Sequence, residues 1–135
     1  MRYVLDTTAF SAVMRRDADL LGLLKKYRPG DIATVPPVVA AIQYGIKRLD
    51  NSSRKYLLLK SERDRLLSLI PVLPWDPESS KDFGEIKADL ERKGKQIDDF
   101  DIAIAAIAIS HKYGVITANL THFRRIRNLE IKTWM

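Results

Sequence analysis

Apolar residues occur in this chain with two kinds of spacing. Short unbroken apolar runs, such as Tyr3-Val4-Leu5, are typical of buried strands, whereas longer segments repeat apolar residues at helical intervals. The runs predict strands at residues 3–5, 31–35, 72–73, 115–117 and 131–134. The longer segments predict helices that start near residues 8, 20, 36, 52, 77 and 102, with a short turn or helix at 119–123.

Strands and helices therefore alternate along the chain. This order favours an α/β fold with a mainly parallel sheet of four or five strands and helices on both faces. Residues 102–113 are apolar on nearly all sides, which predicts a central buried helix, and Gly114 is expected to end it. No repeat or linker interrupts the pattern, so residues 1–135 are expected to form one domain.

Composition narrows the class of protein. Hydrophobic residues make up 46% of the 135 residues, enough for a core, and there is no cysteine for disulfides or thiolate zinc sites. The N-terminus carries an acid at position 6 and lacks the apolar stretch of a signal peptide. The longest weakly polar run, residues 100–110, is too short to span a bilayer. We expect a cytoplasmic protein without a membrane partner.

Charge is distributed unevenly along the chain. The formal net charge is +6, with a local +4 over residues 47–67, +3 over 121–135 and −4 over 76–101. Basic outer segments around an acidic middle suit a protein that attracts a polyanion and holds a cation. Ordinary solvated helix faces explain the same numbers equally well.

Candidate chemistry follows from where polar residues fall relative to the predicted strands. Asp6 directly follows the first strand, Asn119 follows the strand at 115–117, and Asp101 begins the central helix. Ligands of open α/β sheets bind beyond the carboxyl ends of the strands, so the fold can bring these three residues to one edge. Oxygen ligands of this kind select Mg²⁺, or Mn²⁺, and such a metal can activate water for attack on a phosphate.

Structural roles compete with this interpretation at each position. Asp6 could simply cap the first helix, and Asn119 could be a turn residue. The acids at 98, 99 and 101 could favour the dipole of the helix that they precede. His111 and His122 lack a metal-ligand spacing and are interpreted as surface groups. The remaining basic candidates could contact phosphates or form a solvated edge: Arg124, Arg125 and Arg127.

Several segments together resemble the PIN-domain family, and more closely the VapC-type toxins of toxin–antitoxin (VapBC) pairs. The resemblance covers nearly the whole chain. It rests on the order and spacing of Leu5-Asp6-Thr7, Tyr44-Gly45, residues 72–76, residues 84–94, residues 101–106, residues 115–119 with Phe123, and Trp134.

The resemblance implies a PIN-like three-layer α/β/α sandwich and a Mg²⁺-dependent endoribonuclease. Such enzymes act on structured RNA, often tRNA and sometimes rRNA, are silenced by a cognate VapB-type antitoxin and are commonly homodimers. Carried over by position, Asp6 and Asp101 are metal-binding acids, Asp99 is a supporting acid, and Asn119 lies near the metal or its waters.

One position departs from the family pattern. A glutamate usually stands three residues before Tyr-Gly, but this chain has Ala41 there, and a methyl group cannot bind metal or orient water. The natural protein is degenerate, or glutamate was changed to alanine to allow expression of a toxic protein; the second explanation is favoured because the rest of the site is intact. Either way, this chain is expected to be impaired.

Three other functions compete with a working ribonuclease. They are a catalytically inactive RNA-binding or protein-interaction module on a PIN scaffold, a metal-dependent nuclease acting on DNA, and a structural partner that uses the apolar segment 10–24.

Overall fold

A computed structural model describes residues 1–135. A parallel sheet of four strands in the order β2-β1-β3-β4 forms its centre. The strands are β1 (Tyr3–Leu5), β2 (Ile32–Ala33), β3 (Gly114–Ile116) and β4 (Ile131–Lys132). Strand β1 pairs in parallel with both β2 and β3, and β3 pairs in parallel with β4. The predicted α/β fold with a parallel sheet is therefore confirmed.

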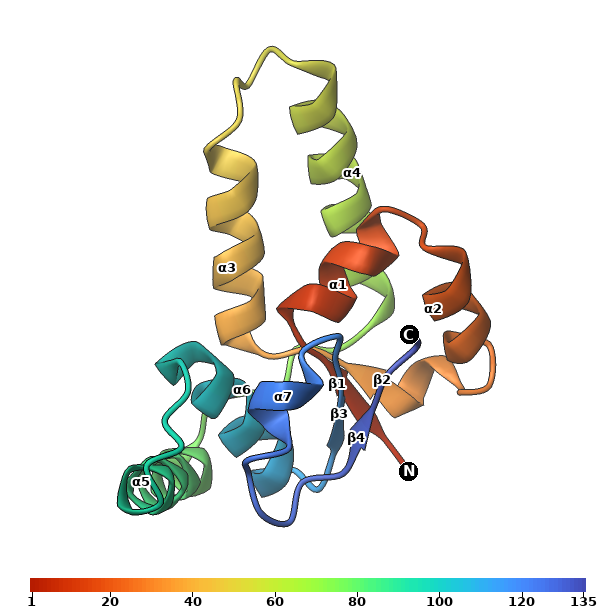
Figure 1. The fold of residues 1–135 in the computed structure, drawn as a ribbon. Helices are drawn as coiled ribbons and strands as arrows, with labels where there is room; N and C mark the ends of the chain where they lie inside the picture. Colours follow the sequence, from red (N-terminus) through yellow and green to blue (C-terminus); the bar gives the residue numbers. More distant parts are fainter.

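Seven helices surround the sheet. They are α1 (Thr7–Met14), α2 (Ala18–Leu24), α3 (Pro36–Lys47), α4 (Arg54–Leu69), α5 (Pro77–Arg92), α6 (Asp99–Ser110) and α7 (Leu120–Phe123), with a 3₁₀ turn, η1, at Pro29–Asp31. In Figure 1, α5 and α6 lie to the left of the sheet and α2 lies to its right. Helices α3 and α4 form a long hairpin that rises above the sheet, with α1 at its base.

Helix α6 is the centre of the core, as its apolar pattern predicts. Residues 102–108 are all buried, and α5 packs along the length of this helix. Since Asp98 caps its N-terminus, the helix begins three residues earlier than expected, and Asp101 lies in its first turn. None of the helices combines the length and apolar character needed to cross a bilayer.

Two of the sequence-based expectations for the elements were wrong. The strand expected at 72–73 is a single parallel bridge between Thr34 and Val72, because only one residue of this extended segment pairs with the sheet edge. Gly114 does not end the central helix. That helix stops at Ser110, Lys112 takes a left-handed conformation with φ 63°, and Gly114 is the first residue of β3.

Candidate active site

Asp6 lies at the carboxyl end of β1 and is almost completely buried, with 2% of its surface exposed. One carboxylate oxygen, Oδ1, accepts hydrogen bonds from the Thr8 hydroxyl at 2.6 Å and from the Ala9 amide at 2.9 Å. The second oxygen, Oδ2, accepts a hydrogen bond from the Thr117 hydroxyl at 2.5 Å. Asp6 therefore caps α1 and also connects β1 to the end of β3.

The two threonines hold the ends of these strands together. The Thr8 hydroxyl accepts a hydrogen bond from the Ala118 amide at 2.9 Å, and the Thr117 hydroxyl accepts one from the Asn119 amide at 2.7 Å. Each hydroxyl thus joins the Asp6 carboxylate to the backbone that follows β3. This chain of hydrogen bonds leaves the carboxylate little freedom to rotate.

Burial raises the pKa of the Asp6 carboxyl above its ordinary value, since removal from water penalises the charged form. The hydrogen bonds from Thr117, Thr8 and Ala9 act in the opposite direction because they favour the ionised form. The Asp101 carboxylate raises this pKa further by charge repulsion, which places the two acids within electrostatic range of each other. A cation between them would relieve both the burial cost and the repulsion.

Asp101 reaches the same edge from the first turn of α6, and its side chain is 20% exposed. Its Oδ2 lies 3.0 Å from Nδ1 of His122, and the Asn119 side-chain amide lies 2.8 Å from that same nitrogen. The contact to Asp101 needs a proton on Nδ1, whereas an amide N–H from Asn119 needs a lone pair there. One imidazole nitrogen cannot do both at once. With a proton on Nδ1, His122 donates to Asp101, and the Asn119 amide must then present its oxygen to this nitrogen.

The structure brings together three of the four predicted site residues. Asp6, Asp101 and Asn119 meet at one edge, but Asp99 points elsewhere. Its carboxylate is 59% exposed and pairs with the Lys87 ammonium at 3.0 Å. In this structure Asp99 connects α6 to α5 and does not contact the other acids.

Sequence reasoning missed two side chains of the site. Thr117 holds Asp6 together with Thr8, and His122, interpreted as a surface group, contacts Asp101 instead. The signal for His122 was its spacing: it lies in α7 three residues after Asn119, which directly precedes that helix, so the two side chains can meet.

Ala41 lies in α3, on the wall of a cleft between α1, α3 and α4. Thr7, the residue after Asp6, lines the same cleft. A longer acidic side chain at position 41 would extend from α3 into this space next to α1. The methyl group of Ala41 leaves the space open.

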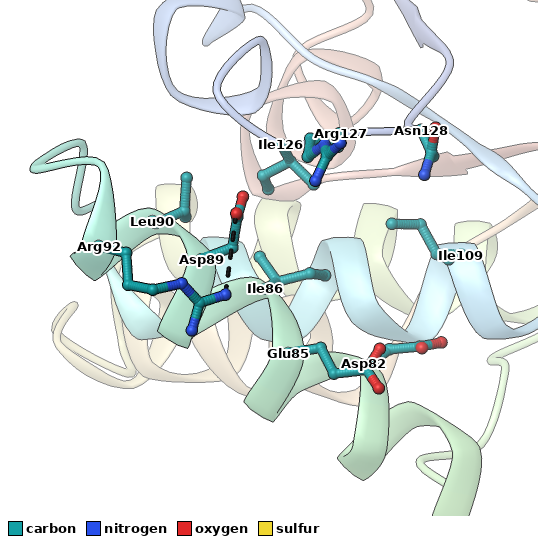
Figure 2. Close-up of a pocket in the computed structure, with 10 residues that line it drawn as sticks. All are labelled: Asp82, Glu85, Ile86, Asp89, Leu90, Arg92, Ile109, Ile126, Arg127 and Asn128. Atoms are coloured by element: carbon teal, nitrogen blue, oxygen red, sulfur yellow. Dashed lines mark ion pairs between the residues drawn. The ribbon is translucent and has the colours of Figure 1, made fainter.

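The three arginines proposed for RNA binding have different surroundings. Arg124 is exposed, whereas the Arg125 guanidinium donates to the Gln96 carbonyl at 2.9 Å. Arg127 lines a cavity between α5 and the segment after α7, which Figure 2 shows with Asp82 and Asp89 on its α5 side. Lys93 lowers the pKa of Asp89, and the positive charges of Arg127 and Arg92 add to this effect. Arg127 therefore faces acidic side chains of its own chain.

The oxygen atoms of Asp6, Asp101 and Asn119 at the carboxyl edge of the sheet fit a hard divalent cation. No three His, Cys, Asp or Glu side chains are gathered closely enough to enclose a metal. Two carboxylates that repel each other and an amide oxygen nevertheless suit Mg²⁺, which is usually held by one or two carboxylates and keeps several waters. The residues present thus fit the metal that the sequence predicts.

Comparison with known proteins shows the family of this chain. The model of the PIN domain family matches residues 3–129. Ribonuclease VapC2 of Rickettsia felis is 30% identical to this chain over 138 residues, covering 99% of the chain and 98% of that protein. This chain belongs to the PIN-domain family, as a member of its VapC group.

The VapC resemblance extends to three dimensions. The crystal structure of VapBC2 from Rickettsia felis bound to a DNA fragment from their promoter superposes with a TM-score of 0.86 at 29% identity, covering 100% of both chains. The tRNA(fMet)-specific endonuclease VapC of Salmonella typhimurium is 37% identical over 68 residues, about half of each protein. The family predicted from the sequence is thus confirmed.

Proposed function

We propose that this protein is the toxin of a VapBC-type toxin–antitoxin pair and that its site is built for Mg²⁺-dependent endonucleolytic cleavage of structured RNA, with tRNA the first candidate. The observation that carries this proposal is the meeting of Asp6, Asp101 and Asn119 at the carboxyl edge of the sheet. The names of the VapC relatives support RNA as the substrate class and a VapB-type antitoxin as the partner. Homodimerisation remains a prediction.

Each residue of the site has a distinct task in this proposal. Asp6 and Asp101 would hold Mg²⁺, which when bound would lower the pKa of a water and offset charge on the phosphate. Thr8 and Thr117 fix the Asp6 carboxylate so that its oxygens do not turn away. His122 orients Asp101, and Asn119 offers an amide to water or phosphate.

Ala41 makes this chain a weak enzyme in our proposal. The site then has two carboxylates where the family pattern has a third, so the cation is held less firmly and water is less well oriented. This position is also the specific observation that favours a second candidate, a PIN scaffold that binds RNA without cutting it.

The decisive experiment is to replace Ala41→Glu and to assay cleavage of total tRNA. We expect Mg²⁺-dependent cleavage at least about 100-fold faster than that of the present chain, equivalent to roughly 3 kcal/mol of transition-state stabilisation. Chelation with EDTA should abolish it. Ala41→Gln is the matched control, because it has a similar shape without the charge and should stay inactive.

Other results would change the proposal. If Ala41→Glu is as inert as Ala41→Gln, the catalytic interpretation fails and the RNA-binding module is favoured. Cleavage that persists in EDTA would remove the metal from the mechanism. A parallel assay with single- and double-stranded DNA tests the substrate class, since faster cleavage of DNA than of tRNA would contradict RNA specificity.

A further inference from the structure

The cleft beside Ala41 has a chemical character that the metal site does not explain. Helices α1, α3 and α4 line it, from the middle of α3 to the first turns of α4, which follow the hairpin connection in Figure 1. Its polar lining consists of two hydroxyls, from Thr7 and Ser11, and two cations, from Arg15 and Lys55. No acidic side chain lines it. Apolar side chains from all three helices complete the wall: Met14, Ile42, Ile46 and Leu59.

The two cations of the cleft are free of partners, unlike their basic neighbours. Arg16 and Arg65 both pair with Glu62, and Arg63 pairs with Asp64. Arg15 and Lys55 are exposed and take part in no ion pair. Two unpaired cations facing one cleft from different helices attract an anion more strongly than either would alone.

The cleft also adjoins the acidic edge. Thr7 follows Asp6 directly in the chain, and Ser11 lies one helical turn further along the same face of α1. Arg15 lies eight residues beyond Thr7, about 12 Å along α1, so an anion held by Arg15 and Lys55 would lie at the end of the cleft away from the carboxylates. Helix α3 contributes only apolar residues to the cleft in this chain.

We infer that Arg15 and Lys55 form a phosphate-binding site for the RNA backbone in this cleft, with the Thr7 and Ser11 hydroxyls as further donors. The inference rests on the proposed function for the identity of the polyanion. Lysine, arginine and hydroxyl side chains are the common phosphate partners in nucleic-acid complexes. The apolar wall suits the sugar or base next to that phosphate.

Binding of bulk tRNA by the chain as it stands, in EDTA, tests the inference without requiring catalysis. The double variant Arg15→Gln/Lys55→Gln should bind about 10-fold more weakly at 100 mM salt. Its slope of log K against log salt should fall by roughly 1.5 to 2, because each lost phosphate contact releases about one counterion fewer. The matched control Lys25→Gln/Lys112→Gln removes the same charge outside the cleft and should change binding less than about 2-fold.

Three results would overturn the inference. Unchanged tRNA binding by the cleft variant would exclude the site. Equal losses of tRNA binding in the two double variants would mean that binding depends on the net charge of the protein and not on the cleft. Loss of binding to poly-L-glutamate with tRNA binding intact would assign the cleft to an acidic polypeptide instead. Thermal melts of both variants ensure that a loss of binding reflects the cleft and not unfolding.

The same variants in the Ala41→Glu background separate this inference from the proposed function. There, removing both cations should raise KM for tRNA about 10-fold and leave kcat within about 3-fold, since the cleft binds substrate and does not act on the bond. If Ala41→Glu fails to cleave while the cleft variant still loses tRNA binding, the nuclease proposal fails and the phosphate site stands.

Discussion

At the scale of single residues, Asp6 combines two roles that the sequence presents as alternatives. It caps α1 through the Ala9 amide, and it presents a buried carboxylate to Asp101. The raised pKa of Asp6 means that the ionised form is harder to keep in the folded state than in the unfolded chain. A buried acid of this kind costs stability, which is typical of groups kept for function.

Replacement of Asp6→Asn should therefore stabilise the protein while abolishing metal binding. Asparagine caps helices as well as aspartate does, so the bond to Ala9 survives and the buried charge is removed. At pH 7 the melting temperature should rise by about 3–5 °C, the shift that about 1 kcal/mol produces in a domain of this size.

The difference in stability between Asp6→Asn and the parent should depend on pH. Below the ordinary pKa near 3.8, the carboxyl is protonated in both states and the variant should gain nothing. As pH rises through the higher pKa of the folded state, the parent loses stability and the gap should open. A variant that melts lower than the parent at pH 7 would contradict the burial argument. Mg²⁺ should raise the melting temperature of the parent and leave Asp6→Asn unchanged.

At the scale of elements, the register of the sheet depends on a close approach at Gly114. This glycine pairs with Tyr3 across β1 and β3, and β4 lies on its other side. A Cβ at position 114 would lie 2.6 Å from Cε1 of Tyr3 and 2.8 Å from the carbonyl oxygen of Glu130. Glycine is therefore required here by space between neighbours and not by a special backbone conformation.

Gly114→Ala should accordingly destabilise the protein by about 1–3 kcal/mol, the usual cost of overpacking a tight site. Gly84→Ala is the matched control, since position 84 lies within α5 and a Cβ there meets nothing within 4 Å. Alanine favours helix, so the control should stabilise by up to about 1 kcal/mol. Urea unfolding followed by circular dichroism measures both, and equal shifts in the two variants would contradict the packing argument.

At the scale of the whole molecule, the hairpin of α3 and α4 is fastened to α1 by a buried acid. The Glu62 side chain, 8% exposed, accepts from Arg16 at 2.7 Å and from Arg65 at 2.8 Å. Hydrogen bonds from Arg65 and then Arg16 lower the pKa of Glu62. Because Arg16 lies just beyond α1, this acid connects the hairpin to the helix that forms the opposite wall of the cleft.

Glu62→Gln should lower the melting temperature at pH 7 by several degrees and weaken tRNA binding through the loosened cleft. A lowered pKa stabilises the fold above the ordinary value near 4.5, and this contribution is lost as pH falls through the pKa of the folded state. The difference between parent and variant should thus close in acid. The exposed Glu91→Gln serves as control, and a gap of constant size from pH 7 to pH 3 would contradict the ion-pair explanation.

Much of the fold and part of the site were accessible from the sequence because they depend on local patterns. The apolar run from Ile102 predicted the central helix, and Asp76-Pro77 and Gly94 marked the ends of α5. The position of Asp6 after β1 predicted its place at the sheet edge. A strand was predicted at 72–73 where only one residue pairs, because pairing depends on a neighbouring strand that sequence spacing does not reveal.

The partners of individual side chains were the hardest features to predict from the sequence. Asp99 and Asp101 are two residues apart on α6, so their side chains point about 200° apart, Asp101 toward His122 and Asp99 toward Lys87. The cleft cations Arg15 and Lys55 are 40 residues apart and adjoin only because the hairpin folds back on α1. Arg127 was a candidate for phosphate until the structure placed it beside the acids of α5.

The sequence by itself determined the α/β order, the buried helix, the family and the absence of a carboxylate at position 41, since all of these follow from residue identity and periodic spacing. Only the tertiary structure decided which acids meet at the carboxyl edge of the sheet and that His122 contacts one of them. It also decided that two unpaired cations line the cleft at Ala41. The physical reason is that Asp6 and Thr117, although 111 residues apart, are joined by parallel pairing of β1 and β3. Contacts of this range depend on packing, which no local pattern specifies.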